Sequence, residues 1–257
     1  MNALKYPIYY INVLIYKAYF SLLGFIRRGR KKLFIYTDSR GYDVNDWRSK
    51  KNPRSSYIMK LLQRQNVTAK ICEYKHTTLL DFIDDIRSVN CSSYDCLVLH
   101  VGVVDFSPRP LVSALKLREL KLEKVARCFG DNAVQEFSLA KHAEMYRGEE
   151  TASLYSTDFL EKYIIPFINN LNVKVIWLPV NEVLSSWSGN YAGVRPVNMN
   201  VILQYQQVID SNAYGCVVPR IINREQDVKC LTVDNIHFSK AGMSEIFRII
   251  SDELGEK

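Results

Sequence analysis

From Lys32 onward, short apolar runs alternate with longer amphipathic stretches, and this alternation constrains the fold more than any other feature of the chain. The apolar runs are rich in β-branched and aromatic residues, which is typical of buried parallel strands, and the stretches between them suit crossover helices. We therefore predict an α/β domain built on a mostly parallel five-stranded sheet. Its strands are expected at 33–37, 67–74, 96–104, 173–180 and, with a weaker pattern, 215–218.

Helices are expected between and after these strands, at 54–66, 78–88, 157–171, 198–212 and 239–254. Ser239 is a suitable N-cap for the last of them, which has Met243, Ile246 and Ile250 on one face. Residues 110–150 break the rhythm, because they are charged and helical in composition. We interpret them as an insertion after the third strand, which acts either as a lid or partner surface above the strand ends or as a solvated helical hairpin.

The chain has 257 residues, 47% of them hydrophobic, which is enough for one domain with a large core. We divide it into an amino-terminal segment, 1–30, and an α/β domain, 31–257. Lys and Arg exceed Asp and Glu by 34 to 27, and much of the excess lies in the basic tract 27–32. A nucleic-acid-binding surface would need basic residues interleaved with aromatic ones elsewhere in the chain, and no such pattern recurs. We expect no nucleic-acid partner.

Residues 7–26 are apolar and aromatic, but Asn12, Lys17 and Ser21 interrupt them, which is marginal for a spanning helix. Their dense positive charge follows the apolar part, whereas a secretory signal places it in front. Aromatic residues followed by a basic tract suit peripheral contact with anionic lipid, so we expect residues 1–32 to contact the inner face of a membrane and the domain to be cytoplasmic. The alternative is a helix that packs on the domain or on a partner subunit.

The six cysteines show no Cys-x-x-Cys pair, and several fall inside apolar runs, where a free thiol packs as a small hydrophobic group. This pattern indicates a reducing compartment. Cys91 and Cys96 have no histidine near them at the spacing of zinc ligands, so we predict no metal and no cofactor.

Ser39 follows the first predicted strand directly, in Thr-Asp-Ser-Arg-Gly, where a parallel sheet presents its carboxyl edge. A serine hydroxyl becomes a nucleophile only beside a base that is itself oriented by a carboxylate. Asp234 and His237 supply both, because an Asp three residues before a His can turn its carboxylate onto the second ring nitrogen. We predict a catalytic triad of these three residues. The alternative is that Asp234 caps the final turn, His237 packs beside it and Ser39 only ends a strand.

With these motifs the chain resembles the SGNH/GDSL hydrolases. The Gly-Asp-Ser motif of that family is matched by 37–39, the Asp-x-x-His motif by 234–237, and the Gly-x-Asn-Asp motif in part by Gly102-Val103-Val104-Asp105. Order and spacing agree over roughly residues 32–254. The resemblance implies a flavodoxin-like three-layer α/β/α sandwich, with an additional amino-terminal hydrophobic or amphipathic helix.

Two departures affect the oxyanion hole that the resemblance implies. In the family its donors are the serine N–H, a glycine N–H after the second strand and the side chain of the third-motif Asn. Here Lys75-His76-Thr77 stands near the glycine position and Val104 at the Asn position. Loss of one such donor costs about 10²–10³ in rate. The candidates for oxyanion or substrate binding, each at or after a strand end, are Arg40, Gly102, Val104, Asp105, Arg109 and Asn181.

Arg109 lies between two prolines in a stiff loop beside the predicted site, in the sequence Asp-Phe-Ser-Pro-Arg-Pro. A rigid guanidinium suits a carboxylate or a phosphate, so we expect it to bind an acidic glycan substrate. The alternative is a structural pair with Asp105 or with the carboxyl end of a helix.

The sequence thus favours a serine-dependent ester hydrolase or O-acyltransferase that acts on a carbohydrate, and by analogy a role in the biosynthesis of bacterial surface polysaccharides. Two alternatives stay open. One is a divergent member of the fold that binds glycan or a membrane partner without acyl chemistry, which Val104 and the missing glycine favour. The other is transfer of a phosphoryl or glycosyl group, with Arg40 and Arg109 as anion holders.

Overall fold

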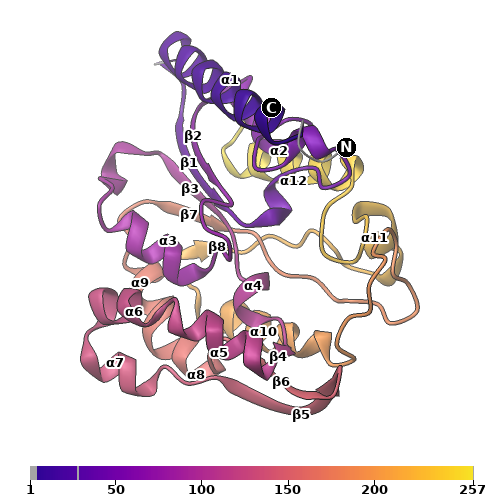
Figure 1. Ribbon diagram of the computed structural model, residues 1–257. Helices are drawn as coiled ribbons and strands as arrows, with labels where there is room; N and C mark the ends of the chain where they lie inside the picture. The colour runs from indigo at the N-terminus through magenta and orange to yellow at the C-terminus, as the bar shows by residue number, and fades with distance from the viewer. Residues whose placement is uncertain (1–4, 28, 257) are drawn as a thin grey trace.

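The computed structural model describes residues 5–27 and 29–256 (Figure 1). Its centre is a five-stranded sheet in the order β2-β1-β3-β7-β8, and all four neighbouring pairs are parallel. The strands are β1 (Lys32–Thr37), β2 (Asn66–Ile71), β3 (Cys96–His100), β7 (Lys174–Trp177) and β8 (Cys216–Val217). This order is that of a flavodoxin-like fold, and the predicted α/β architecture is confirmed.

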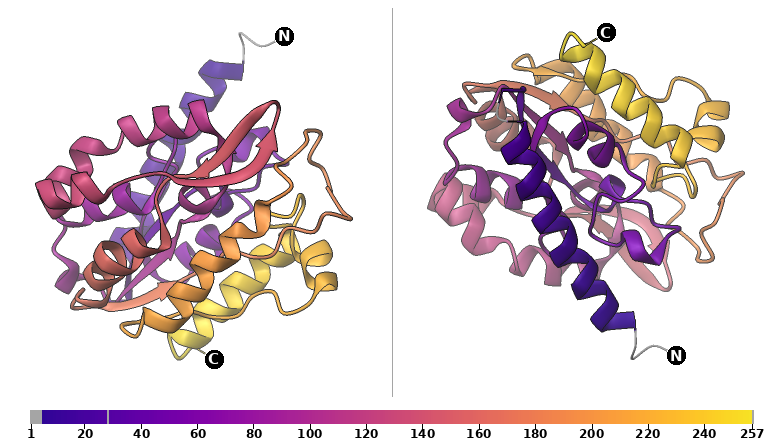
Figure 2. Two further views of the ribbon diagram at one scale, coloured as in Figure 1. Left: turned by 90° about the horizontal axis from the view of Figure 1, so that it is seen from below. Right: turned by 90° about the horizontal axis from the view of Figure 1, so that it is seen from above.

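Helices cover both faces of the sheet, which makes three layers (Figures 1 and 2). One face carries α1 (Lys5–Ile26), α2 (Tyr57–Leu62) and α12 (Lys240–Glu253). The other carries α3 (Leu79–Ile86), the segment formed by α8 (Thr157–Phe159), a π-helical turn (Leu160–Ile164) and α9 (Ile165–Asn169), and α10 (Ile202–Asn212). Short 3-10 turns at Ser39–Gly41, Trp47–Ser49, Cys91–Ser93 and Met199–Val201 connect these elements.

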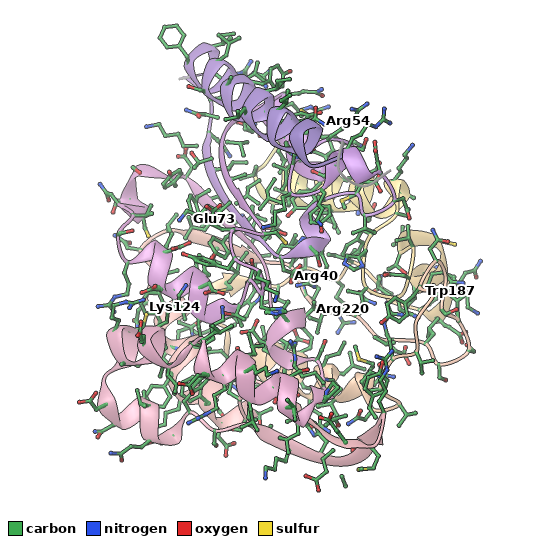
Figure 3. All side chains as sticks on the ribbon, in the orientation of Figure 1. Arg40, Arg54, Glu73, Lys124, Trp187 and Arg220 are labelled. Atoms are coloured by element: carbon green, nitrogen blue, oxygen red, sulfur yellow. The ribbon has the colours of Figure 1, made fainter. Side chains whose placement is uncertain are left out.

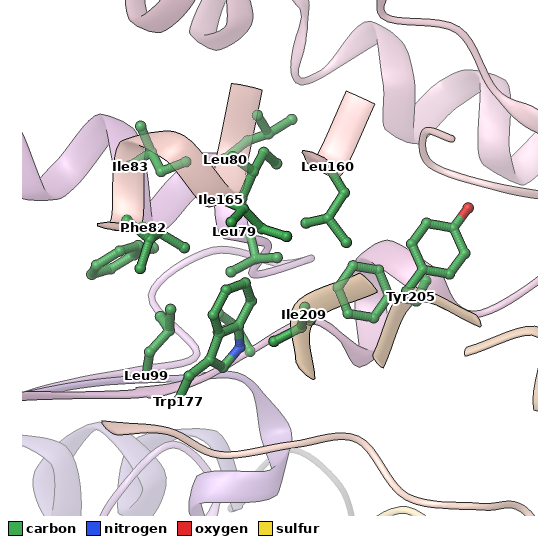
Figure 4. Close-up of a cluster of buried hydrophobic side chains, with 14 of the residues drawn as sticks. Leu79, Leu80, Phe82, Ile83, Leu99, Leu160, Ile165, Trp177, Tyr205 and Ile209 are labelled. Carbon is green, nitrogen blue, oxygen red and sulfur yellow. The ribbon is translucent and has the colours of Figure 1, made fainter. Parts of the chain in front are cut away.

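Alternate residues of each central strand supply two separate cores. In β1, Phe34 and Tyr36 point to the core under α3 and α10, whereas Leu33 and Ile35 point to the core under α2 and α12. Burial on both faces explains why the strands appear in the sequence as continuous apolar runs. Figure 4 shows the first core, where Leu79 and Ile83 of α3 meet Trp177 of β7.

The strand ends differ from the prediction at the edge that carries the site. β2 ends at Ile71, because Cys72 has a left-handed backbone with φ of 50°. β3 ends at His100 rather than continuing to Val104. Gly102 has φ of 126°, and the chain then forms the short helix α4 (Val103–Phe106). Ser239 caps α12 as predicted, by accepting a bond from the Gly242 N–H.

The insertion was predicted to be helical, and only its first half is. It forms β4 (Arg109–Pro110), α5 (Leu111–Glu119), α6 (Leu122–Phe129) and α7 (Asp131–Glu136), and then the hairpin strands β5 (Ala140–Tyr146) and β6 (Glu149–Ser153). β4, β6 and β5 make a small antiparallel sheet. Lys121 and Lys124 reach the buried carboxylate of Asp81 on α3, both at 2.6 Å. These pairs anchor the helical half of the insertion beside α3.

One further helix, α11 (Glu225–Leu231), was not predicted, and it lies next to α12. Across the described part of the chain, no helix combines the length and the apolar character that a bilayer-spanning segment needs.

Candidate active site

Ser39 lies where β1 gives way to a tight turn at the carboxyl edge of the sheet. Asp38 caps this turn by accepting a hydrogen bond from the Arg40 N–H at 2.9 Å. The Gly41 N–H bonds to the Asp38 carbonyl. The Ser39 N–H has no hydrogen-bond partner among the described residues. A side chain at position 41 would lie 2.3 Å from Thr37, which explains why a glycine stands two residues after the serine. Ser39 itself stays partly exposed to solvent.

Arg40, the next residue, is fully buried, and Figure 3 labels it near the middle of the molecule. Its guanidinium binds both oxygens of Asp38 and donates to the Pro179 carbonyl at 2.9 Å. Because Pro179 follows β7, Arg40 ties the ends of two strands together. These contacts favour a structural role for Arg40 over the predicted contact with substrate or an oxyanion.

Asp234 and His237 lie in the turn between α11 and α12, and the structure brings both to Ser39. The Asp234 carboxylate accepts the His237 backbone N–H at 2.8 Å through one oxygen and the ring Nδ1 at 2.9 Å through the other. On the far side of the ring, His237 Nε2 lies 2.9 Å from Ser39 Oγ. The three side chains therefore form a continuous hydrogen-bonded chain in which 198 residues separate Ser39 from its base.

Burial would raise the pKa of the Asp234 carboxyl, but the bonds from the His237 ring and backbone outweigh it and lower the pKa to about 2. The carboxylate is thus ionised at neutral pH. An ionised acceptor on Nδ1 favours the ring tautomer with its proton there. This tautomer leaves the lone pair of Nε2 facing the Ser39 hydroxyl, which is the arrangement that a general base needs.

The sequence did not reveal Arg195, whose Nη2 lies 3.3 Å from the same Asp234 oxygen that binds the His237 ring. Its guanidinium carbon also lies 3.8 Å from the centre of the Tyr191 ring. Both contacts come from the long segment 178–198 between β7 and the turn before α10. No local pattern around position 195 signals this placement, because its partner is 39 residues away.

The segment 178–198 also braces the turn that holds Asp234 and His237. Asn235, with φ of 73°, accepts from the Leu184 N–H at 2.9 Å, and the Asn190 N–H bonds to the Val233 carbonyl at 2.7 Å. Asn181 takes part in the same bracing, because its amide donates to the carbonyls of Asn235 at 2.7 Å and Glu182 at 2.8 Å. Both amide hydrogens of Asn181 are therefore used within the protein, which favours a bracing role over the predicted one as an oxyanion donor.

The third-motif segment, residues 102–105, packs against and bonds to neighbouring parts of the core. A side chain on Gly102 would lie 2.7 Å from the Phe106 ring, which explains the glycine. Asp105 is buried and accepts from the Leu79 N–H at 3.0 Å and the Tyr155 hydroxyl at 2.9 Å. Burial raises its pKa to about 7, although these two bonds oppose the shift. Asp105 thus joins α4 to α3 and to Tyr155, which favours a structural role over the predicted one at the substrate.

Val104 sits in α4, partly exposed, and its side chain has no donor to offer. The segment at the second-motif position closes on itself, because Thr77 Oγ1 donates to the Tyr74 carbonyl at 3.1 Å, and the His76 carbonyl accepts from Lys121 at 2.9 Å. The third-motif position therefore supplies no side-chain donor, while the contacts of 74–77 hold that segment to itself and to Lys121.

Arg109 lies close to this segment, in β4, with most of its side chain buried. Its Nη2 donates to the Val104 carbonyl, while its Nε has no partner among the described residues. Burial lowers the pKa of the guanidinium, and Asp105 partly counters this. The contact with a helical carbonyl agrees with the structural alternative, while the unpartnered Nε leaves one donor for a ligand.

A hollow of about 800 Å³ lies past the ends of β7 and β8, and Ser39, Asp234 and His237 are not among the residues that line it. It reaches Asn181 and also Phe238, the neighbour of His237. Polar and charged side chains dominate its wall, among them Gln206, Asp210, Arg220, Asn223 and Arg224.

Comparisons with known proteins agree with this geometry at the level of fold. No family model matches the sequence, and no curated protein matches it either. Among solved structures, the lipase/acylhydrolase from Enterococcus faecalis superposes with a TM-score of 0.50 at 13% identity, covering 87% of this chain and 95% of that one. A phospholipase A1 from Streptomyces albidoflavus covers 87% and 99% at 11% identity, with a TM-score of 0.46. The chain thus has the SGNH/GDSL hydrolase fold that its motifs predict.

Proposed function

We propose that this protein is a serine-dependent ester hydrolase or O-acyltransferase. The observation that carries the proposal is the chain of hydrogen bonds from Asp234 through His237 to Ser39, each link 2.9 Å long. Three groups at these distances, with the serine partly exposed and the carboxylate ionised, are those that nucleophilic acyl chemistry requires.

The reaction would proceed in two halves. Ser39 Oγ attacks the acyl carbon while His237 Nε2 accepts the hydroxyl proton, and the tetrahedral intermediate then expels the alcohol, to which His237 returns that proton. Asp234 stabilises the imidazolium between these steps. The Ser39 N–H is the donor best placed for the negative oxygen, since no group in the described residues occupies it. Water or a second hydroxyl then attacks the acyl-enzyme, and this choice separates a hydrolase from a transferase.

We further propose that the alcohol is part of a carbohydrate. The support is the hollow past β7 and β8, which reaches Phe238, the neighbour of His237. Its polar side chains can bond to several hydroxyl groups, and Arg220 and Arg224 suit an acidic sugar. A role in the biosynthesis of surface polysaccharides is the wider form of this proposal, and a cytoplasmic location beside a membrane belongs with it.

The proposal is tested by labelling the folded protein with a fluorophosphonate, which reacts only with an activated serine. Wild type should be labelled, and Ser39→Ala and His237→Ala should not. Asp234→Asn should reduce labelling by about 10⁴, since it removes the carboxylate that stabilises the imidazolium. The matched controls are the exposed Ser138→Ala, and His142→Ala, whose Nε2 lies 3.0 Å from Ser153 Oγ on the β5–β6 hairpin, away from the triad.

Two outcomes would count against acyl chemistry. Labelling that survives Ser39→Ala would place the nucleophile elsewhere. A folded wild type that takes no label would favour a divergent protein that binds glycan or a membrane partner, or one that transfers a phosphoryl or glycosyl group. The specific observation behind these alternatives is Val104, which leaves the third-motif position without a donor. Release of acid from acetylated sugars, compared with simple aryl esters, then tests the carbohydrate part separately.

A further inference from the structure

The excess of positive over negative charge in this protein lies at one end of the chain. The formal net charge is +7, and residues 1–32 contain seven Lys and Arg residues with no Asp or Glu. The remaining 225 residues therefore carry equal numbers of basic and acidic side chains. A basic surface of this kind recruits anionic partners, whereas the neutral domain has no such preference.

The same end of the chain exposes a continuous apolar stripe on α1. Ile11, Leu14, Ile15, Leu22 and Ile26 are each more than half exposed, with Leu14 at 66%. Their spacing follows one face of a helix, with steps of three and four residues. Within the described side chains of α1, Leu23 is the one that is buried, and it joins the core under α2 and α12. The helix thus rests on the domain along one edge and leaves an apolar face in solvent.

The basic residues lie at the carboxyl end of that stripe. Arg27, Arg30 and Lys31 line a hollow of about 910 Å³ together with Arg64, opposite a single carboxylate, Glu256. Glu256 is bonded to the Gln65 amide, and Arg27 and Lys31 donate to the carbonyls of Leu62 and Leu254. Arg30 has no such bond among the described residues, and Lys32 is exposed next to it. The hollow therefore has room and charge for an anionic headgroup.

We propose that the outer face of α1 and the basic residues at its carboxyl end form one surface that docks on an anionic lipid bilayer. The apolar stripe would enter the boundary between headgroups and acyl chains while the basic residues contact the phosphates. Figures 1 and 2 show α1 lying along the outside of the sheet's helical layer, with its outer side uncovered over its length.

The combination of charge and apolar surface favours a lipid bilayer over a second copy of the chain or a nucleic acid. A second copy packed on the stripe would bring two segments of +7 together, and repulsion opposes that contact. A nucleic acid would satisfy the charge but leave the apolar stripe exposed. Anionic lipid satisfies both features at once, since it offers a negative surface above an apolar layer.

The test is co-sedimentation with vesicles of phosphatidylcholine, with and without phosphatidylglycerol. Wild type should bind the anionic vesicles and bind neutral ones at least about tenfold more weakly. Two double variants, Leu14→Glu with Leu22→Glu and Arg30→Glu with Lys32→Glu, should each weaken binding to anionic vesicles by about tenfold or more. Circular dichroism should show that both variants fold.

Matched controls lie on the insertion. The exposed Leu115 and Leu120, changed together to Glu, should bind as wild type does, and so should the pair Lys116→Glu with Lys141→Glu. Ser39→Ala should also bind normally, which separates this proposal from the esterase proposal. A folded wild type that stays in the supernatant would overturn the docking surface. A second result would also overturn it. If light scattering shows that wild type is a dimer and that the variant with Leu14→Glu and Leu22→Glu is a monomer, the stripe is a contact between copies.

Discussion

The two sides of the candidate site differ in how many of the groups needed for catalysis they supply. On the triad side, formed by Ser39 and the turn 234–237, every polar atom of the relay has its partner, and the backbone on both flanks is fixed by caps and bridges. On the oxyanion side, formed by 72–77 and 102–109, the polar groups bond within these segments or to neighbouring parts of the fold, such as Leu79 and Tyr155. The proton-transfer machinery is thus complete, while charge stabilisation depends on few donors.

A residue can therefore occupy a family motif position, or lie next to the nucleophile, and still have a structural role. Asp105 occupies the place of the third-motif Asp, yet its carboxyl joins three elements of the core and is buried. Arg40 follows the nucleophile directly, yet it ties two strand ends together. A residue near a reacting atom in sequence or in space needs an unoccupied donor before it can assist the reaction.

Among changes on the oxyanion side, the largest effect is expected from Val104→Asn, which would add the side-chain donor that this side lacks. Val104 is partly exposed at the start of α4, so an amide can be placed there without burying it unpaired. Since one oxyanion donor is worth about 10²–10³ in rate when well aligned, we expect kcat for a 4-nitrophenyl ester to rise by about tenfold or more. The measurement is steady-state hydrolysis with Ser39→Ala subtracted.

Val104→Leu is the control for this prediction, because its side chain has the same number of heavy atoms and the same branching as that of Asn, and no donor. A gain in both variants would point to packing, and no gain in either would show that the amide at this position does not reach the oxyanion.

A second prediction concerns the stability that the oxyanion side contributes through Asp105. Because burial raises its pKa to about 7, the folded protein keeps the proton between about pH 4 and pH 7, where the unfolded chain releases it. The unfolded state then binds fewer protons, so stability falls as pH rises through this window and levels off above it. Asp105→Asn imitates the protonated form and should remove this contribution.

We therefore expect the melting temperature of wild type to fall between pH 5 and pH 8 by about 2–4 °C more than that of Asp105→Asn. The measurement is thermal unfolding followed by circular dichroism at both pH values. The exposed Asp158→Asn should retain the wild-type difference. Parallel curves for wild type and Asp105→Asn would show that the buried carboxyl does not titrate in this range.

Much of this architecture could be predicted from the sequence because its signals are local. The four longer strands appear as apolar runs, since parallel strands are buried on both faces, and the Asp-x-x-His spacing alone sets the first hydrogen bond of the relay. Ser39 was found because a strand ends immediately before it. The flavodoxin-like order of the strands was implied by the resemblance to the SGNH/GDSL hydrolases, and the Ser39-to-His237 span ends just before α12, whose cap at Ser239 was predicted from the sequence.

The errors arose where one residue redirects the chain or where partners are distant in sequence. Gly102 ends β3 and starts α4, although the apolar run continues to Val104. The hairpin of β5 and β6 turns at Arg147 and Gly148, both with positive φ, whereas the usual signal for such a turn is Asn-Gly. Arg195 reaches the triad through a loop whose path depends on tertiary contacts, and no local pattern encodes that path.

The smallest expected effect lies on the triad side, at Arg195. Its guanidinium shares an Asp234 oxygen with the His237 ring, so it competes for the negative charge that stabilises the protonated imidazole. In Arg195→Gln this competition ends, and Asp234 stabilises the imidazolium that forms in the transition state more strongly. We expect kcat/KM for a 4-nitrophenyl ester at neutral pH to rise by about twofold to threefold. Arg195→Lys keeps the charge and should leave kcat/KM unchanged. A role limited to bracing the loop would lower kcat/KM and the melting temperature of both variants, and that result would remove Arg195 from the account of the triad.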